Sequence, residues 1–214
     1  MAELPETPGM TTSGDRAVAD AAARAAGTRE VNIDSVPSLP VPADTANVRL
    51  GPEIDSACLA LLPMVGIWRG TGRFGNDPGE RAPQFGQQIT VSHDGRAFLR
   101  FESVMWSLGA DGAASGPGAR EVGWLRPQAD GTIELLLTHA EGRIEVFYGR
   151  AESLTSWALS TDAVWRTPSG PAVIGATRLY GITGDGKLAY VEERALADAE
   201  LAPYASAALD RIAG

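Results

Sequence analysis

The side chains that most often bind metals or carry out acid–base catalysis are scarce in this chain. Among 214 residues there are two histidines, His93 and His139, and one cysteine, Cys58. A zinc site needs three or four ligands, usually Cys or His, so we expect no metal site. A single cysteine cannot form an internal disulfide, and Cys58 is expected to be a buried, unreactive side chain.

Neither histidine belongs to a recognisable catalytic pattern. The run Ser92-His93-Asp94 has the residue types of a hydrolase triad, but neighbours on a strand point to opposite faces. His93 precedes Asp-Gly and His139 precedes Ala-Glu-Gly, so both are expected where strands turn. The adjacent pair Glu192 and Glu193 also faces two ways, which does not suit a carboxylate pair in one cleft. We therefore expect no catalytic residues and no enzyme.

Composition excludes several other classes of protein. The formal net charge is -9, whereas a nucleic-acid-binding protein normally carries a basic patch. No apolar run reaches the length of about 18 residues that suggests a membrane span. The first residues, MAELPETPGM, have neither a basic region nor an apolar region of a secretory signal. These features predict a cytoplasmic protein that binds neither nucleic acid nor membrane.

The chain divides into an N-terminal extension without aromatic residues and a domain that contains all of them. No aromatic residue precedes Trp68, and the first part is rich in proline, at Pro5, Pro8, Pro37, Pro40, Pro42 and Pro52. Residues 1–52 are therefore expected to be disordered or loosely packed, with a short helix at Asp15–Ala26 that Gly27 would end. Residues 53–214 are expected to form the folded domain.

The folded domain is predicted to be mostly strands. A short helix is expected over residues 54–65, capped by Asp55 or Ser56, with Leu59, Leu62 and Val65 as its apolar face. From Gly66 onward about ten strands alternate with turns, which favours an all-β, antiparallel closed barrel that can enclose one small ligand. The last segment, residues 198–214, is expected to be helical, with Leu201, Tyr204, Ala208 and Leu209 facing inward.

The most distinctive motif is a tryptophan followed by glycines at alternate positions. Gly66, Trp68, Gly70 and Gly72 share one face if residues 66–72 form a strand. The two glycines after the indole permit a sharp bend or a close approach of another group. The motif lacks the spacing of a phosphate-binding loop, so we interpret it as structural, with Trp68 closing one end of the barrel.

The motif GIWRGTG, after the apolar turn LALLPMV, resembles the start of the nitrobindin family. The resemblance continues through HDGRAFLRFES, REVGWLRP, IELLLTHAEGRIEVFYG, KLAYVEERAL and LAPYASAALDR, and so covers roughly residues 54–214. That family is similar to fatty-acid-binding proteins and lipocalins. The resemblance implies a ten-stranded antiparallel barrel.

The resemblance also implies a haem site that this chain changes. Typical nitrobindins hold haem iron through a histidine near the C-terminus, and Asp210 is expected to occupy that position here. Haem-bearing members bind nitric oxide and isomerise peroxynitrite to nitrate. The chain is most similar to the ferric nitrobindin-like branch, which lacks the histidine, so we expect neither haem nor that activity. One alternative is a haem-dependent isomerase with another ligand, such as the Tyr204 phenolate, His93 or His139.

The expected function is then the binding of an unidentified small hydrophobic or amphipathic ligand. Tyr190, Glu192 and Arg194 share one face of a predicted strand, and fatty-acid-binding proteins hold a carboxylate through Arg and Tyr near their last strand. Tyr190, Arg194 and Tyr204 are thus the candidate pocket residues. Two alternatives stay open: Glu192 and Arg194 form an exposed pair, or the barrel is filled with side chains and serves as an interaction module.

Overall fold

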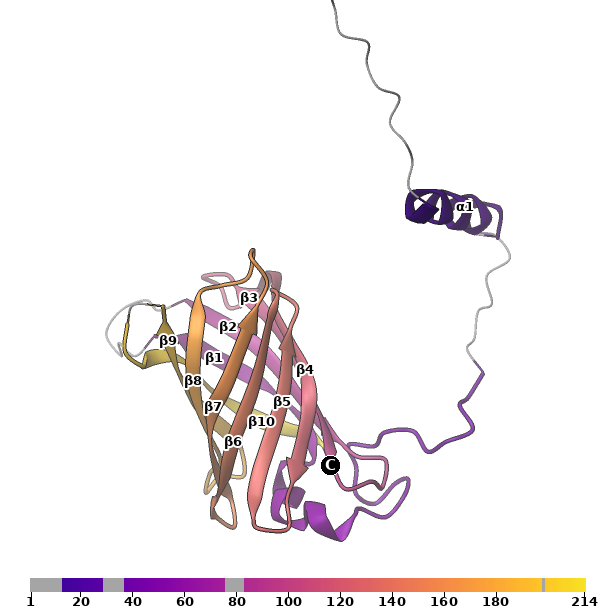
Figure 1. The fold of residues 1–214 in the computed structure, drawn as a ribbon. Helices are drawn as coiled ribbons and strands as arrows, with labels where there is room; N and C mark the ends of the chain where they lie inside the picture. Colours follow the sequence, from indigo (N-terminus) through magenta and orange to yellow (C-terminus); the bar gives the residue numbers. More distant parts are fainter. Residues whose placement is uncertain (1–12, 29–36, 76–82, 198) are drawn as a thin grey trace, which may run out of the picture. The chain divides into compact units, whose positions relative to one another are not determined.

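Ten antiparallel strands close into a barrel in the computed structural model, which describes residues 13–28, 37–75, 83–197 and 199–214 (Figure 1). Each strand pairs with its neighbours in sequence, and β1 closes the barrel against β10. The strands are β1 (Gly66–Phe74), β2 (Gln84–Ser92), β3 (Leu99–Leu108), β4 (Ala114–Pro127), β5 (Thr132–His139), β6 (Arg143–Ser153), β7 (Ser156–Arg166), β8 (Val173–Ile182), β9 (Leu188–Leu196) and β10 (Ala202–Ala213). The predicted fold class is confirmed.

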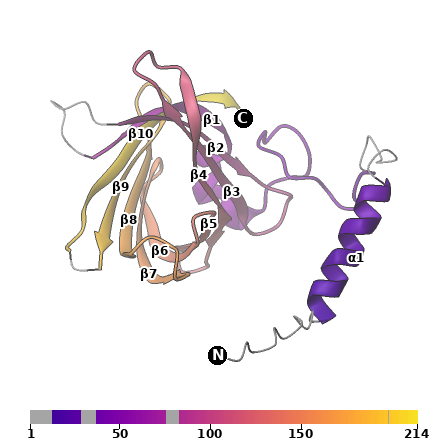
Figure 2. The same cartoon turned by 90° about the horizontal axis from the view of Figure 1, so that it is seen from above.

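The two ends of the barrel differ in what covers them. A short 3-10 helix, η2 (Ser56–Met64), lies before β1 at one end, which we call the helix end (Figures 1 and 2). The opposite end, which we call the far end, includes the turns between β3 and β4, β5 and β6, and β7 and β8. The predicted hairpin turns are present, with Gly95, Gly142 and Gly186 at positive φ.

Helix η2 confirms the predicted short helix but presents a different face. Asp55 caps it, with its carboxylate accepting a hydrogen bond from the Ala57 amide at 2.8 Å. A 3-10 helix has three residues per turn, so Cys58, Leu61 and Met64 share the buried face. Leu59, which the α-helical spacing placed inward, is exposed for this reason. Burial raises the pKa of Cys58 to about 11, which is consistent with an unreactive thiol.

The predicted C-terminal helix is wrong, because residues 202–213 form strand β10. Its alanines favour a helix in isolation. In the barrel, however, β1 and β9 would each have an unpaired edge without this segment, and β10 pairs with both. The strand period also buries Ala205, Ala207 and Leu209 on one face.

The described residues of the N-terminal part include helix α1 (Ser13–Thr28), which contains the predicted helix at Asp15–Ala26. Residues 1–12 and 29–36, on which part of the predicted disorder falls, lie outside the described residues. The chain forms two compact units, residues 1–40 and 41–214. The second unit includes residues before η2, where Thr45 pairs with His93 through backbone hydrogen bonds. Among the described residues, no helix has the length and apolar character needed to cross a membrane.

Candidate functional site

The interior of the barrel has two chemically different halves. Inward positions near the helix end hold a continuous apolar core. Its fully buried side chains include Leu61, Met64, Trp68, Leu99, Phe101, Leu125, Leu135, Leu188 and Leu209. Toward the far end the inward positions instead hold ionisable side chains from β4, β5, β6, β8 and β9. We call these residues the ionic cluster: Glu121, His139, Arg143, Glu145, Arg178, Glu192 and Arg194.

Arg178 and Glu121 form the centre of the ionic cluster. The two guanidinium nitrogens of Arg178 donate to the Glu121 carboxylate at 2.7 and 3.1 Å, and Glu192 lies 3.3 Å from the same guanidinium. Burial alone would raise the pKa of Glu121, but the Arg178 charge outweighs it and lowers the pKa to about 2. Glu121 and Arg178 are therefore charged at neutral pH, and all three side chains are buried.

His139 lies in a second part of the cluster, beside Arg143 and Glu145. Its Nε2 is 2.7 Å from a Glu145 oxygen, and its Nδ1 is 3.0 Å from an Arg143 nitrogen and 3.4 Å from Glu121. Arg143 is fully buried, and burial together with the nearby Arg194 charge lowers its pKa. Both His139 nitrogens therefore already have neighbours in the cluster.

Arg194 connects the cluster to Tyr204 at the far end. Its Nε donates to Glu192 at 2.6 Å, and its guanidinium lies 3.5 Å from the centre of the Tyr204 ring. Burial raises the pKa of the Tyr204 phenol, and the Arg194 charge opposes that effect. No hydrogen bond from the Tyr204 hydroxyl is found among the described residues. The ring also packs against Phe74, with ring centres 5.4 Å apart.

A small cavity lies beside this aromatic pair at the far end. Its volume is about 240 Å³, and its lining includes Phe74, Phe85, Met105 and Gly118. Phe74, Phe85 and Met105 lie at inward positions of β1, β2 and β3, whereas Gln84, Trp106 and Leu108, which also line the cavity, lie at outward positions. The far end therefore brings together an apolar hollow, a phenol and the arginines of the ionic cluster.

The structure brings the three candidate pocket residues together only in part. Tyr190, Glu192 and Arg194 all face the interior, and Glu192 is 2% exposed, so the alternative of an exposed Glu192–Arg194 pair is excluded. Tyr190 lies deeper, where its hydroxyl donates to Gln87 at 2.9 Å. Arg194 and Tyr204 are in direct contact at the far end.

The glycine and tryptophan motif lies mainly at the helix end. Trp68 is fully buried, and its indole N–H donates to the Met64 carbonyl at 2.8 Å. A Cβ at Gly70 would lie 2.5 Å from the Ala208 carbonyl oxygen, and one at Gly72 would lie 2.3 Å from the Phe85 ring. The two glycines thus allow β10 and Phe85 to approach β1 closely.

Asp210 faces away from the barrel interior. It follows the buried Leu209 on β10, its side chain is 62% exposed, and its carboxylate is 2.8 Å from the Lys187 ammonium. In this orientation the carboxylate does not reach an interior ligand. The assignment of position 210 to the family's haem ligand stays a prediction.

His93 directly follows β2 at the helix end, whereas the ionic cluster lies toward the far end. It is 1% exposed, and neither ring nitrogen has a hydrogen-bond partner among the described residues. The sequence did not predict the cluster, although three of its members were singled out for other roles: His139, Glu192 and Arg194. The alternation Arg143-x-Glu145 on one strand and Arg178-x-Tyr180 on another was the available signal.

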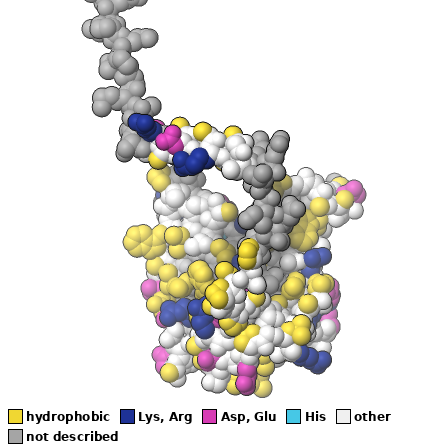
Figure 3. Space-filling model, turned by 90° about the vertical axis from the view of Figure 1, so that its right-hand side faces the viewer, with side chains coloured by type: hydrophobic (Ala, Val, Ile, Leu, Met, Phe, Trp, Pro, Cys, Tyr) yellow, Lys and Arg dark blue, Asp and Glu magenta, His cyan; other side chains and the backbone are white. Residues whose placement is uncertain are grey.

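The outer wall of the barrel carries several exposed hydrophobic side chains. Hydrophobic side chains gather on the face shown in Figure 3. Exposed hydrophobic residues on β4, β6 and β7 include Val122, Trp124, Ile144, Tyr148 and Trp165. A groove crosses another part of the wall and is described below. Among the described residues, no group of three or more potential metal ligands occurs.

Comparisons with known proteins agree with this architecture. A family model described as a THAP4-like, heme-binding beta-barrel domain matches residues 57–211. A "Ferric nitrobindin-like protein" of Saccharopolyspora erythraea is 52% identical, covering 94% of this chain and 95% of the relative. "Peroxynitrite isomerase 2" of Rhodococcus jostii is 50% identical, covering 94% and 98%. The crystal structure of Rv2717c from M. tuberculosis has a TM-score of 0.63 at 28% identity, covering 74% of this chain and 99% of that one.

These comparisons correct two expectations from the sequence. The expectation that the protein is not an enzyme is contradicted by relatives at 50 and 51% identity that are named peroxynitrite isomerases. The expectation that it has no haem is contradicted by the family model, which describes a haem-binding barrel. Both expectations rested on one position, Asp210, and not on the residues that line the interior.

The residues at the far end fit haem in donor type and charge. Iron in haem proteins accepts His, Cys, Met or Tyr as an axial ligand. Tyr180 is unsuited, because burial raises its pKa to about 12 and it accepts a hydrogen bond from Arg178. The Tyr204 hydroxyl has no hydrogen-bond partner among the described residues, and its ring packs against Phe74, which lines the cavity. That cavity is smaller than typical ligand pockets of about 300–1,000 Å³, so haem binding requires side chains there to move.

Proposed function

Because the chain belongs to the nitrobindin family of haem-binding barrels, we propose that it binds haem and isomerises peroxynitrite, with Tyr204 as the iron ligand. Haem is amphipathic, so it takes the place of the unidentified ligand that the sequence predicted. The observation that carries the proposal is the Tyr204 phenol, which has a guanidinium on its ring and lies beside the apolar cavity. A cytoplasmic location stays a prediction.

Arg194 and Arg143 determine the electrostatics of this site. A phenolate is a hard, anionic donor, and positive charges beside it favour the deprotonated form. Arg194 contacts the Tyr204 ring, and both arginines lower the pKa of the phenol, whereas burial, the largest effect, and the charges of Glu192 and Glu141 raise it. The same guanidinium groups attract an anionic substrate such as peroxynitrite to the far end.

The ionic cluster positions Arg194. Glu192 holds the Arg194 Nε at 2.6 Å and is itself 3.3 Å from Arg178, which Glu121 fixes from the opposite wall. This chain of contacts directs Arg194 toward Tyr204. When bound, the haem would supply the iron at which the O–O bond of peroxynitrite rearranges to give nitrate, with no net oxidation or reduction.

Binding of iron by Tyr204 must release the phenol proton. Burial raises the pKa of Tyr204, so the phenol is protonated at neutral pH before haem binds. At pH values below the pKa of the phenol, haem affinity should therefore increase about tenfold for each unit by which the pH rises. A haem held by contacts that do not involve this proton would show no such slope.

A hemin titration followed at the Soret band tests the proposal. We expect stoichiometric binding to the wild-type chain and at least about tenfold weaker binding to Tyr204→Phe, which also loses the phenolate-to-iron charge-transfer band and the pH slope. The hemin-loaded wild-type protein should accelerate peroxynitrite decay beyond the same concentration of free hemin.

Tyr148→Phe is the matched control, because Tyr148 is an exposed tyrosine at an outward position of β6. It should bind hemin as the wild-type chain does. Equal affinity and equal spectra for Tyr204→Phe and Tyr148→Phe would reject Tyr204 as the ligand. Peroxynitrite decay no faster than with free hemin would reject the isomerase activity.

A further inference from the structure

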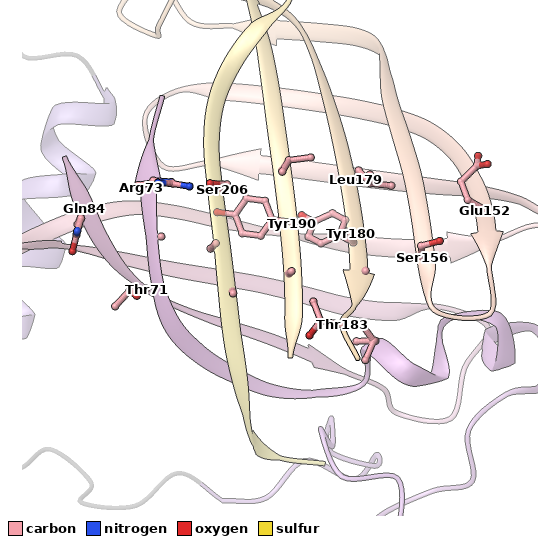
Figure 4. A pocket seen from close by; sticks show the side chains of 17 residues that line it. Thr71, Arg73, Gln84, Glu152, Ser156, Leu179, Tyr180, Thr183, Tyr190 and Ser206 are labelled. Atoms are coloured by element: carbon pink, nitrogen blue, oxygen red, sulfur yellow. The ribbon is translucent and has the colours of Figure 1, made fainter. Parts of the chain in front are cut away.

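A groove of about 850 Å³ crosses the wall of the barrel and shares only Gln84 with the lining of the far-end cavity (Figure 4). Its lining comes from β1, β6, β7, β8, β9 and β10, with Gln84 of β2 at one edge. Its volume is within the range of about 300–1,000 Å³ that is typical of ligand sites. No activity proposed above uses it.

The groove lies on the outside of the barrel. Tyr180 and Tyr190 point to the interior and are buried, so their strand neighbours Leu179 and Val191 point outward, and both are about half exposed. Thr71 and Arg73, at the outward positions of β1, are exposed as well. A ligand can therefore reach the groove without opening the barrel.

Two rows of outward residues shape the groove. Thr71, Ala208, Ala189, Gly181 and Ser156 are direct cross-strand neighbours on β1, β10, β9, β8 and β7. These small side chains form its floor. In the adjacent row, Arg73, Ser206, Val191 and Leu179 are neighbours on β1, β10, β9 and β8. The larger side chains of this row form one side of the groove.

The two ends of the groove have opposite charge. Figure 4 shows Arg73 at one end and Glu152 at the other, with Ser206, Tyr190, Tyr180 and Leu179 between them. Both charged residues are exposed. Within the described part of the chain, neither forms an ion pair, and they are the only charged side chains in the lining. The groove thus has an unpaired cation at one end and an unpaired anion at the other.

We propose that this groove binds a short extended peptide with free termini, with its carboxylate at Arg73 and its ammonium at Glu152. Neighbouring strands are about 4.8 Å apart, and five such spacings separate β1 from β6, which carries Glu152, so the path between the two charged ends measures about 24 Å. An extended peptide advances about 3.3 Å per residue, so about seven residues span this path. Thr71, Ser206 and Ser156 supply hydroxyls that can hydrogen-bond to peptide groups, and Val191 and Leu179 contact small apolar side chains.

Other ligand classes match the lining less well. A fatty acid has one charged end and would leave Glu152 beside an apolar tail. A nucleic acid would place phosphates against Glu152 on a protein of net charge -9. A peptide with free termini matches both charges and the mixed lining between them.

The experiment uses the full chain and the heptapeptide Ala-Val-Ser-Ala-Val-Ser-Ala. We expect saturable binding by calorimetry, with amide chemical-shift changes confined to β1, β10, β9, β8, β7 and β6. The same peptide with an acetylated amino end and an amidated carboxyl end should bind about tenfold more weakly, because both end charges are absent. Ala208→Trp, which fills the floor at an exposed position, should abolish binding.

Charge reversal provides the second arm. Arg73→Glu and Glu152→Arg should each weaken binding of the free peptide about tenfold. The double variant should restore binding to within about threefold of wild type, because the peptide can then lie in the opposite direction. Hemin binding should be unchanged in all of these variants, since the groove lies outside the barrel.

Three outcomes would overturn the proposal: equal affinity for the capped and free peptides, binding that survives Ala208→Trp, or a double variant as weak as the single ones. Absence of saturable binding by the wild-type chain at millimolar peptide would do so as well. None of these results bears on the haem site.

Discussion

The helix end and the far end of this barrel are built from the same alternating strands but hold opposite chemistry. At the helix end the inward positions hold Trp68, Leu61 and other apolar side chains, whose burial stabilises the fold by about 25 cal/mol per Å². Toward the far end they hold the ionic cluster, and each buried ion costs several kcal/mol before pairing offsets it. The comparison indicates that the helix end supplies stability, whereas the far end sacrifices some of it for a functional site.

The largest expected effect separates the two halves directly. Trp68→Ala should destabilise the protein by about 4 kcal/mol, because it removes a fully buried indole and leaves the Met64 carbonyl without its partner. Urea unfolding followed by circular dichroism measures the change. Trp165→Ala is the matched control: Trp165 is 70% exposed, so its loss should change stability by less than about 0.5 kcal/mol. Similar losses for both variants would refute the assignment of stability to the helix end.

The helix end was largely predictable from sequence, and the ionic cluster toward the far end was not. The hairpins at Gly95 and Gly186 and the capped turn at Asp55 are specified by residues close together in the chain. Cluster partners are distant instead: Glu121 and Arg178 are separated by 57 positions and meet only because the barrel closes. The strand β10 was missed for a similar reason. Its alanines favour a helix locally, and its pairing as a strand depends on β1 and β9.

The pH dependence of stability tests the ionic cluster. The pKa of Glu121 is about 2 in the folded protein, against an ordinary value of 4.5. A lowered folded-state pKa gives stability that is present above about pH 4.5 and is lost as the pH falls toward 2. The expected loss is up to about 3 kcal/mol over this range, measured by urea unfolding at each pH. Glu145, whose pKa is also lowered, adds in the same direction.

Glu121→Gln isolates the contribution of this one carboxylate. The variant should be less stable at pH 7, because Arg178 keeps only Glu192 as a charged partner, and it should lose less stability on acidification than the wild-type chain. A wild-type acid profile as shallow as that of the variant would show that the Glu121–Arg178 pair does not stabilise the folded state.

The smallest effect is expected at Asp210, which belongs to neither half because it lies on the outer wall. Asp210→Asn removes only an exposed contact with Lys187, so stability should change by less than about 0.5 kcal/mol. The informative pair is Asp210→His and Tyr204→His, compared by hemin titration. If the interior at the far end holds haem, Tyr204→His should give a histidine-type ferric spectrum and Asp210→His should not, because its ring would face solvent. A histidine-type spectrum in Asp210→His would instead place the ligand position at residue 210 and require β10 to turn in the haem-bound protein.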